Sequence, residues 1–367
     1  MPILIINYGN YKDYISKMYK LKQLQEDFEV EEINKTICKG KVNGSYAYFL
    51  MEKRNLTTIT ALKKLSAILG IPIKNFGFAG NKDKNAITKQ HISILNAKKS
   101  SREKISGKVN ETINLNYLGN FRNPISLGDL DGNKFIIVIR NITQQDIKKI
   151  REFPSSFMMP NYFGSQRFGT LNVEIGKCIV KKNFSRAAEL IMNTRKDEKN
   201  NLGNYLKANK SDFIGAIRLI TKKEALMYVH SYQSGIFNSV LFGILGSSEY
   251  PLDPVTKNIK IPIVGFGYNP EEYDSKISEE TDKILKKENI SPRDFIIKQL
   301  PELSSEGASR TSLSDVKDFQ ILSAGEDEMN PGMKKIKVEF MLSKGSYATV
   351  AVDFILNGCK NAVKNVI

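Results

Sequence analysis

The sequence predicts a protein of mixed α and β structure with two domains, one of them inserted into the other. The chain has 367 residues, which exceeds the size of a typical single domain. Strand-like segments occur before residue 154 and again after residue 333. Between them, from about residue 160 to residue 321, apolar residues recur mainly at helical intervals. Hydrophobic residues make up 41% and charged residues 26%, a composition that excludes a disordered or collagen-like chain.

The first region divides into short elements. Residues 28–33 alternate apolar and acidic side chains, and residues 45–53 are rich in aromatic ones, so both segments predict strands. Thr57 or Thr58 caps a predicted helix that ends at Gly70. Further strands are predicted at residues 75–80, 89–95 and 134–140, with a polar loop at 81–88.

The rest of the chain is predicted to be helical first and then mixed. Residues 186–192 and 223–245 are the clearest helical segments. The end returns to strand and helix, at residues 334–342 and 346–356. Residues 1–6 are apolar but lack a basic leader, which favours a buried strand over a signal peptide. No run of 18 apolar residues occurs, so no membrane-spanning helix is expected.

The net charge of +16 suggests a polyanionic partner, most simply RNA or DNA. A lysine-rich proteome is an equally simple explanation of this charge. The three cysteines, Cys38, Cys178 and Cys359, form no disulfide pattern, which favours a reducing compartment. The two histidines, His91 and His230, are far apart, and no zinc-binding cluster is present.

Asp83 is the candidate for chemistry in the polar loop. The segment "GNKDK" differs from the guanine-reading motif of GTPases because Asp83 follows Lys82 directly, and the chain has no phosphate-binding loop. A GTPase or ATPase is therefore disfavoured. Lys82 and Lys84 flank Asp83 and would hold its carboxylate ionised, as a nucleophile or base toward RNA requires. The alternative is a solvated lysine-rich loop.

The longer run "FAGNKDKNAITKQ", at residues 78–90, closely resembles the signature of the TruD family of tRNA pseudouridine synthases. Other blocks match the family in the same order: "KQLQEDFEVEEI" at 22–33, "LGDLDGNKFIIVIR" at 127–140, "PNYFGSQRFG" at 160–169 and "GSYAT" at 345–349. The chain is thus similar to the family, in its archaeal or eukaryotic-like form, over almost its whole length.

The resemblance implies roles for seven residues. Asp83 matches the catalytic aspartate of the family. The implied substrate-binding residues are Phe28, Asn133, Phe135, Tyr347, Lys22 and Lys82. Asn133 and Phe135 match the residues that contact and stack on the target uracil, and the lysines line the active site. For the three aromatic residues, packing in the core is the alternative.

The fold that the resemblance implies is α+β. A pseudouridine synthase catalytic domain, with a largely antiparallel mixed sheet flanked by helices, carries an inserted TRUD α/β domain. The expected boundaries are 1–158 and 322–367 for the catalytic domain and 159–321 for the insertion. The implied protein is a cytoplasmic, monomeric isomerase that converts uridine to pseudouridine at position 13 of tRNA, with no cofactor, metal or membrane.

Two departures from the family pattern keep a second hypothesis open. Asp353-Phe354 stands where an Arg-Glu pair is usual, and residues 242–244 stand where a Ser-x-Arg element is usual. A non-catalytic RNA-binding protein or RNA chaperone on the same fold would fit these losses. Retention of Asp83, Asn133 and Phe135 favours the enzyme.

Overall fold

The computed structural model describes residues 19–34, 44–97, 106–194, 196–246 and 252–366. Contacts divide the chain into two compact units. The sheet unit comprises residues 17–157 and 315–348, and the helical unit comprises residues 158–314 and 349–367. The domain boundaries expected after residues 158 and 321 stay predictions. The strand predicted at residues 1–6 lies outside the described residues, as does Cys38.

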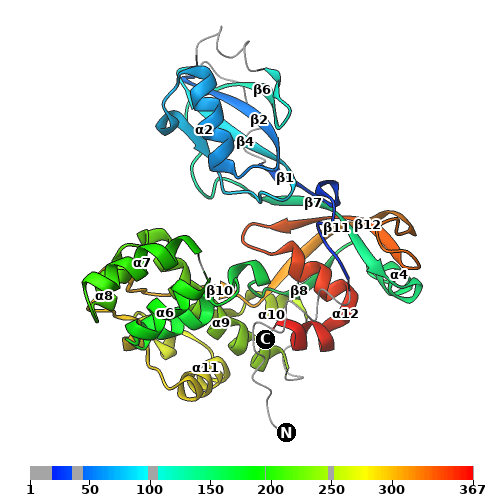
Figure 1. Ribbon diagram of the computed structural model, residues 1–367. Coiled ribbons are helices and arrows are strands. Elements are labelled where there is room, and N and C mark those ends of the chain that lie inside the picture. The colour runs from blue at the N-terminus through cyan, green and yellow to red at the C-terminus, as the bar shows by residue number, and fades with distance from the viewer. Residues whose placement is uncertain (1–18, 35–43, 98–105, 195, 247–251, 367) are drawn as a thin grey trace. The chain divides into compact units, whose positions relative to one another are not determined.

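The sheet unit is built on one mixed, largely antiparallel sheet, as expected (Figure 1). Its strands are β1 (Phe28–Ile33), β2 (Tyr46–Arg54), β3 (Phe76–Phe78), β4 (Ile87–Leu95), β5 (Gly107–Asn110), β6 (Ile113–Phe121), β7 (Gly132–Ile142), β11 (Leu313–Glu326) and β12 (Lys334–Ser343). They follow the spatial order β5-β6-β2-β4-β1-β7-β12-β11, and β3 pairs with β4. β1 is parallel to β4 and antiparallel to β7, so it joins two strands that follow it in sequence.

Helix α2 (Thr58–Leu69) covers one face of β2 and β4 (Figure 1). Its buried residues pack with those strands in one apolar core that includes Ala61, Leu62, Leu65, Phe49, Met51, Ile92 and Ile94. The Thr57 side chain caps the helix by accepting from the Thr60 amide. Gly70 ends the helix at φ +64°, a conformation that favours glycine. Both helix ends are therefore those that the sequence predicts. The unit also contains η1 (Gln25–Asp27), η3 (Ile73–Asn75) and α4 (Gln144–Arg151).

The helical unit packs around the long helix α9 (Lys222–Leu245), most of whose residues are buried. The other helices are α5 (Asn172–Val180), α6 (Phe184–Thr194), α7 (Lys196–Ala208), α8 (Phe213–Arg218), α10 (Pro254–Asn258), α11 (Ser275–Glu288) and α12 (Ala348–Val366), with η4 (Ser165–Arg167), η5 (Pro270–Glu272), η6 (Pro292–Phe295) and η7 (Pro301–Leu303). Strands β9 (Lys260–Ile263) and β10 (Ala308–Thr311) form a small antiparallel pair, and β8 (Phe157–Pro160) begins at the unit boundary.

The sequence predictions of local structure hold best where the apolar pattern is strong. The strand predicted at residues 28–33 is β1, and the helix predicted at 223–245 is α9. The helical character expected up to residue 321 is wrong beyond residue 303, because β10 and β11 occupy that stretch. Much of β11 is exposed, so it lacks the regular apolar alternation that marks a half-buried strand. Within the described residues, none of the helices combines the length and apolar character that crossing a membrane would require.

Candidate active site

Asp83 lies on the loop between β3 and β4, and its side chain is 39% exposed. One carboxylate oxygen, Oδ2, is 2.7 Å from the Nζ atom of Lys22, a residue 61 positions away in sequence. Lys22 is more enclosed, at 19% exposure. The carboxylate is thus held by a cation and still open to solvent. A carboxylate in this situation can act as a nucleophile or a base on a molecule that binds at the surface.

Lys22 is fixed by its backbone as well as by its charge. Its φ angle is +58°, in the left-handed region that residues other than glycine rarely adopt. Its Nζ atom lies 4.1 Å from the centre of the Phe28 ring, which is within the range of a cation–π interaction. The ammonium group is therefore placed between an aromatic ring and the Asp83 carboxylate.

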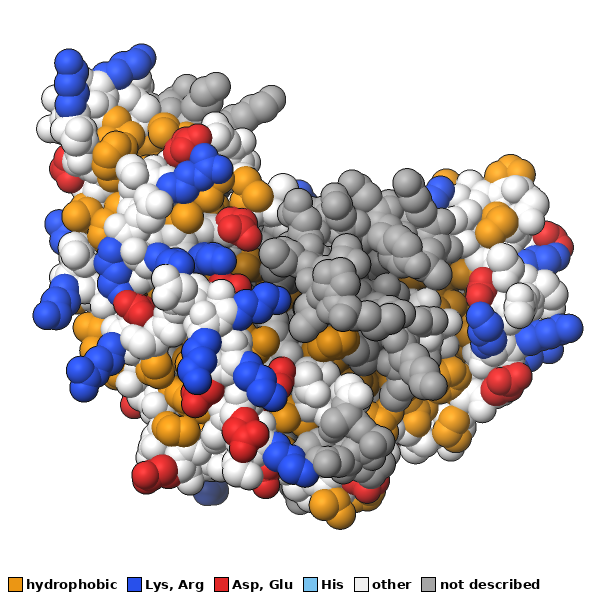
Figure 2. Space-filling model, turned by 90° about the horizontal axis from the view of Figure 1, so that it is seen from below, with side chains coloured by type: hydrophobic (Ala, Val, Ile, Leu, Met, Phe, Trp, Pro, Cys, Tyr) orange, Lys and Arg blue, Asp and Glu red, His pale blue; other side chains and the backbone are white. Residues whose placement is uncertain are grey.

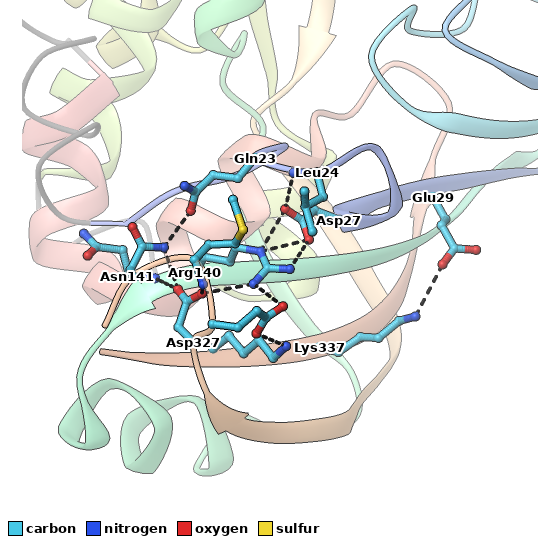
Figure 3. Close-up of polar contacts among 12 residues, drawn as sticks. Gln23, Leu24, Asp27, Glu29, Arg140, Asn141, Asp327 and Lys337 are labelled. Atoms are coloured by element: carbon cyan, nitrogen blue, oxygen red, sulfur yellow. Dashed lines mark hydrogen bonds and ion pairs between the residues drawn. The ribbon is translucent and has the colours of Figure 1, made fainter. Parts of the chain in front are cut away.

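A buried ion cluster anchors the segment that carries Lys22 (Figure 3). Arg140 on β7 donates to both carboxylate oxygens of Asp27 at 2.8 to 3.0 Å, and to Asp327 at 3.0 Å. The backbone of Arg140 also pairs with that of Lys20. Lys20 and Asp27 lie on either side of Lys22 in the chain, so Arg140 restrains the segment at both ends. This explains how an unfavourable backbone conformation at Lys22 is maintained.

Lys82, the chain neighbour of Asp83, points to different partners. Its Nζ atom is 2.9 Å from Glu32 Oε2 and donates to Asn133 Oδ1 at 2.8 Å. Glu32 is buried, and burial raises the pKa of its carboxyl group, but hydrogen bonds from His91 and Lys82 and the Lys82 charge together bring the pKa below its usual value. The lysine that contacts the Asp83 carboxylate is therefore Lys22 rather than Lys82, contrary to what the spacing in the loop suggests.

Two of the three aromatic residues expected to contact the substrate, Phe28 and Phe135, lie within the sheet. Phe28 on β1 is 2% exposed and Phe135 on β7 is 7% exposed. Their rings meet edge to face at 6.1 Å, and the Phe135 ring stacks on that of Phe340 at 5.7 Å. Asn133 stands two residues before Phe135 and faces the same side of β7. The structure thus brings Asn133, Phe135 and Phe28 together beside the lysines, with the rings largely covered by protein.

Tyr347 is half-buried and follows β12 by a short turn. The end of β12 pairs with the start of β7, since Ser343 is opposite Gly132 and Leu342 is opposite Asn133. The Lys344 amide also donates to the Asp131 carbonyl. The turn that leads to Tyr347 therefore lies at the end of β7 that carries Asn133.

Sequence reasoning missed Glu32 and Lys53 as members of this site. Lys53 on β2 is fully buried, and its Nζ atom donates to the main-chain oxygen atoms of Leu56 at 2.6 Å and of Asp83 at 2.9 Å. Burial lowers its pKa to about 8, against an opposing effect of the Asp83 charge. The sequence does carry an indication of this site. Lys53 continues the alternating buried row of Phe49 and Met51 on β2, at a position where an apolar residue is normal.

Family blocks outside this site have packing roles in the helical unit. Asn238 on α9 is fully buried and exchanges two hydrogen bonds with the backbone of Phe163, at 2.9 and 3.0 Å. The segment at residues 242–244 contains Gly243, where a Cβ atom would lie 2.2 Å from a carboxylate oxygen of Glu280 on α11. The glycine in this departure from the family pattern therefore leaves room for the Glu280 side chain against α9.

A family model described as tRNA pseudouridine synthase D (TruD) matches residues 16–203 and 253–353. These ranges include Lys22, Asp83 and Asn133. This match places the protein in the class of tRNA pseudouridine synthases. Because the model matches most of the chain, the chain belongs to the TruD family.

Individual relatives agree with this assignment. A Methanosarcina mazei protein named "Probable tRNA pseudouridine synthase D" is 32% identical over 91% of this chain and 92% of its own length. The Aquifex aeolicus tRNA pseudouridine synthase D is 28% identical, over 90% of this chain and 96% of its own. A crystal structure of the TruD protein of Methanosarcina mazei superposes with a TM-score of 0.69 and 30% identity, covering 95% of this chain and 94% of that one.

Proposed function

We propose that this protein isomerises uridine to pseudouridine in tRNA and that its target is the uridine at position 13, in the D-stem region. The ion pair between Lys22 and Asp83 carries the proposal. It holds the partly exposed carboxylate of Asp83, on the loop with the family signature, 2.7 Å from the Nζ atom of Lys22. The relatives named tRNA pseudouridine synthase D support tRNA as the substrate. Position 13 rests on the family resemblance.

The proposed reaction rearranges bonds within one nucleotide. The bond between uracil N1 and C1′ of the ribose breaks, the base turns, and C1′ bonds to C5. The proton lost from C5 is balanced by the proton gained at N1. The Asp83 carboxylate starts the reaction either by attack on C1′ or by removal of the C2′ proton, and Lys22 orients it and balances its charge.

The proposed base contacts follow from the groups around Asp83. Asn133 Oδ1 accepts from Lys82, so the amide NH2 group of Asn133 is left to donate to a carbonyl oxygen of the uracil. Phe135, the more exposed of the two rings, would supply the aromatic contact to the base, with Phe28 packed edge to face behind it and Tyr347 at the same end of β7. A nucleotide that leaves its stacked position needs an apolar contact of this kind.

The charge of the protein supports a nucleic-acid substrate. The net charge is +16, and Figure 2 shows Lys and Arg side chains scattered among acidic ones over the helical unit, at the left of the view. Cations spread in this way can contact phosphates along an extended RNA. The cysteine pattern supports a reducing compartment such as the cytoplasm, where we propose that the protein acts as a monomer, without metal or cofactor.

The test is conversion of uridine in unmodified tRNA transcripts by the purified full-length protein. Pseudouridine is mapped at each position by chemical labelling and primer extension. We expect a product at position 13 and none with the Asp83→Asn variant. Conversion at another position would show that position 13 is not the target, while the proposed pseudouridine synthase activity would stand. Tight tRNA binding without any conversion would favour the RNA-binding hypothesis instead.

A further inference from the structure

Three buried polar side chains lie beneath the Asp83 loop. They are Lys53 on β2, Thr58 at the first turn of α2 and Gln90 on β4, and each is 0% exposed. Lys53 is opposite Thr88 in the β2–β4 pairing, and Met51 is opposite Gln90, so Lys53 and Gln90 face the same side of the sheet. This is the side that α2 covers.

Each of the three side chains binds the main chain of the loop at a different residue. Gln90 Nε2 donates to the Gly80 carbonyl at 3.3 Å. The Lys82 amide donates to Thr58 Oγ1 at 2.9 Å, and Lys53 Nζ donates to the Asp83 carbonyl at 2.9 Å. The loop backbone is therefore hydrogen-bonded at Gly80 and Lys82, before Asp83, and at Asp83 itself.

Thr58 and Gln90 also bond to each other, and Lys53 has a second backbone partner. The Thr58 hydroxyl donates to Gln90 Oε1 at 2.8 Å, so this hydroxyl is both donor and acceptor. Lys53 Nζ has a second carbonyl partner, Leu56, in the turn just before α2. Two groups of hydrogen bonds, that of Thr58 with Gln90 and that of Lys53, thus join strand and helix to the same loop. A set in which each member has a partner makes a buried polar cluster rigid rather than loose.

Stability alone does not explain these residues. A buried lysine is costly, and the row of Phe49 and Met51 shows that an apolar side chain fits this face of β2. The loop itself is short of apolar anchors, since Asn81, Lys84 and Asn85 are exposed. Without the polar contacts, little would fix the main chain on which the Asp83 carboxylate depends.

We propose that Lys53, Thr58 and Gln90 are positioning residues for Asp83: they hold the loop backbone so that the carboxylate meets Lys22 and the substrate in one geometry. The inference rests on the proposed function, because it assigns to Asp83 the chemical step. Misplacing a reacting group by about 1 Å can cost about a hundredfold in rate, so loss of a single contact should be visible in the chemical step.

The chain offers a matched pair of buried threonines for the test. Thr58 accepts from the Lys82 amide. The hydroxyl of Thr88, which is also fully buried and lies opposite Lys53 on β4, has no hydrogen-bond partner among the described residues. Valine has the same shape as threonine in both places. Thr58→Val thus removes a loop contact, and Thr88→Val removes a hydroxyl that makes none.

The experiment measures the single-turnover rate at saturating tRNA, the KM for tRNA, the melting temperature and hydrogen exchange of the Lys82 amide in the full-length protein. We expect Thr58→Val to lower the rate about 10- to 100-fold, with KM within about threefold, and to expose the Lys82 amide to exchange. Thr58→Ser should restore both, and Thr88→Val should resemble the wild type. Lys53→Met should lower the rate in the same way.

Two results would overturn the inference. One is a Thr58→Val protein with wild-type rate and wild-type protection of the Lys82 amide. The other is a loss of rate that only follows a loss of melting temperature and is equal in Thr88→Val. If the wild type converts no uridine, the proposed function fails, and amide exchange still decides whether Thr58 holds the loop.

Discussion

Lys22 and Asp83 form an ion pair across 61 residues of sequence, and Lys22 adopts a left-handed backbone conformation at this contact. The pairing of β1 with β4 makes the contact possible, because Lys22 precedes β1 and Asp83 precedes β4, and the two strands run parallel. The two residues thus approach the sheet from the same end. The catalytic proposal and the first two predictions below depend on this pair.

Replacement of Asp83 by asparagine is expected to abolish turnover and to leave folding almost unchanged. The side chain is 39% exposed, and an ion pair with this exposure contributes at most about 1 kcal/mol to the free energy of unfolding. The measurements are single-turnover pseudouridine formation, melting temperature and tRNA affinity. Wild-type conversion by Asp83→Asn would show that another group performs the chemistry.

Replacement of Lys22 by methionine should lower the rate of the chemical step about 10- to 100-fold, since a hydrogen bond to a charged group is worth about 1.5–3 kcal/mol. Lys84→Met is the control, because Lys84 is an exposed lysine on the loop that carries Asp83. That control should weaken tRNA binding slightly and leave the rate at saturating tRNA unchanged. Equal losses in the two variants would mean that overall positive charge, not the contact with Asp83, is what matters.

Phe135 is expected to matter for both stability and chemistry, and Phe340 separates the two effects. The two rings stack at 5.7 Å, and both are buried, so alanine at either position should lower the free energy of unfolding by about 3–5 kcal/mol. Rates are compared at a temperature where both variants stay folded. If Phe135 contacts the base, Phe135→Ala alone should show an added rate loss. Equal rates would return Phe135 to a purely structural role.

Lys53 should give the protein a pH-dependent stability. Its pKa is about 8 in the folded protein and 10.5 for an exposed lysine, so the unfolded chain binds more protons between these values. The cost of burying the charged form is fully present below pH 8 and is relieved as the pH rises from 8 to 10.5. The wild type should gain up to about 3 kcal/mol in this interval relative to Lys53→Met. Denaturant unfolding at pH 7 and pH 10 measures the difference, and parallel stabilities would contradict it.

Binding of tRNA should weaken steeply with salt. A protein of net charge +16 that contacts several phosphates releases counterions on binding, so the logarithm of the affinity falls linearly with the logarithm of salt concentration. Between 50 and 200 mM salt we expect a loss of at least about tenfold. The chemical rate at saturating tRNA should change little. An affinity that is flat across this range would refute binding through phosphates.

The position of the site could be predicted from the sequence more fully than its internal contacts. Asp83 and its loop were found because they lie in a continuous motif, and β1 was found because its residues alternate. The partners of Lys82 could not be found in this way. Glu32 and Asn133 come from two other strands, and only the register of β1 with β7, which places them opposite each other, brings them to Lys82. β5 carries a weak pattern because its residues are largely exposed. β6 was missed although its buried Ile113 and Leu115 alternate with exposed asparagines.

The buried cluster around Arg140 also has a consequence for the order in which the enzyme becomes competent during synthesis. The cluster joins Asp27 and Arg140 to Asp327, and Lys20 donates to Asn330 beside it. Asp83 and Lys22 are both translated early, but the segment that holds Lys22 lacks two of its anchors until residues 327 and 330 have left the ribosome. Strand β12, which pairs with β7, is made later still. A nascent chain can therefore contain the aspartate and its lysine long before they are locked together, so an incomplete protein should not modify RNA.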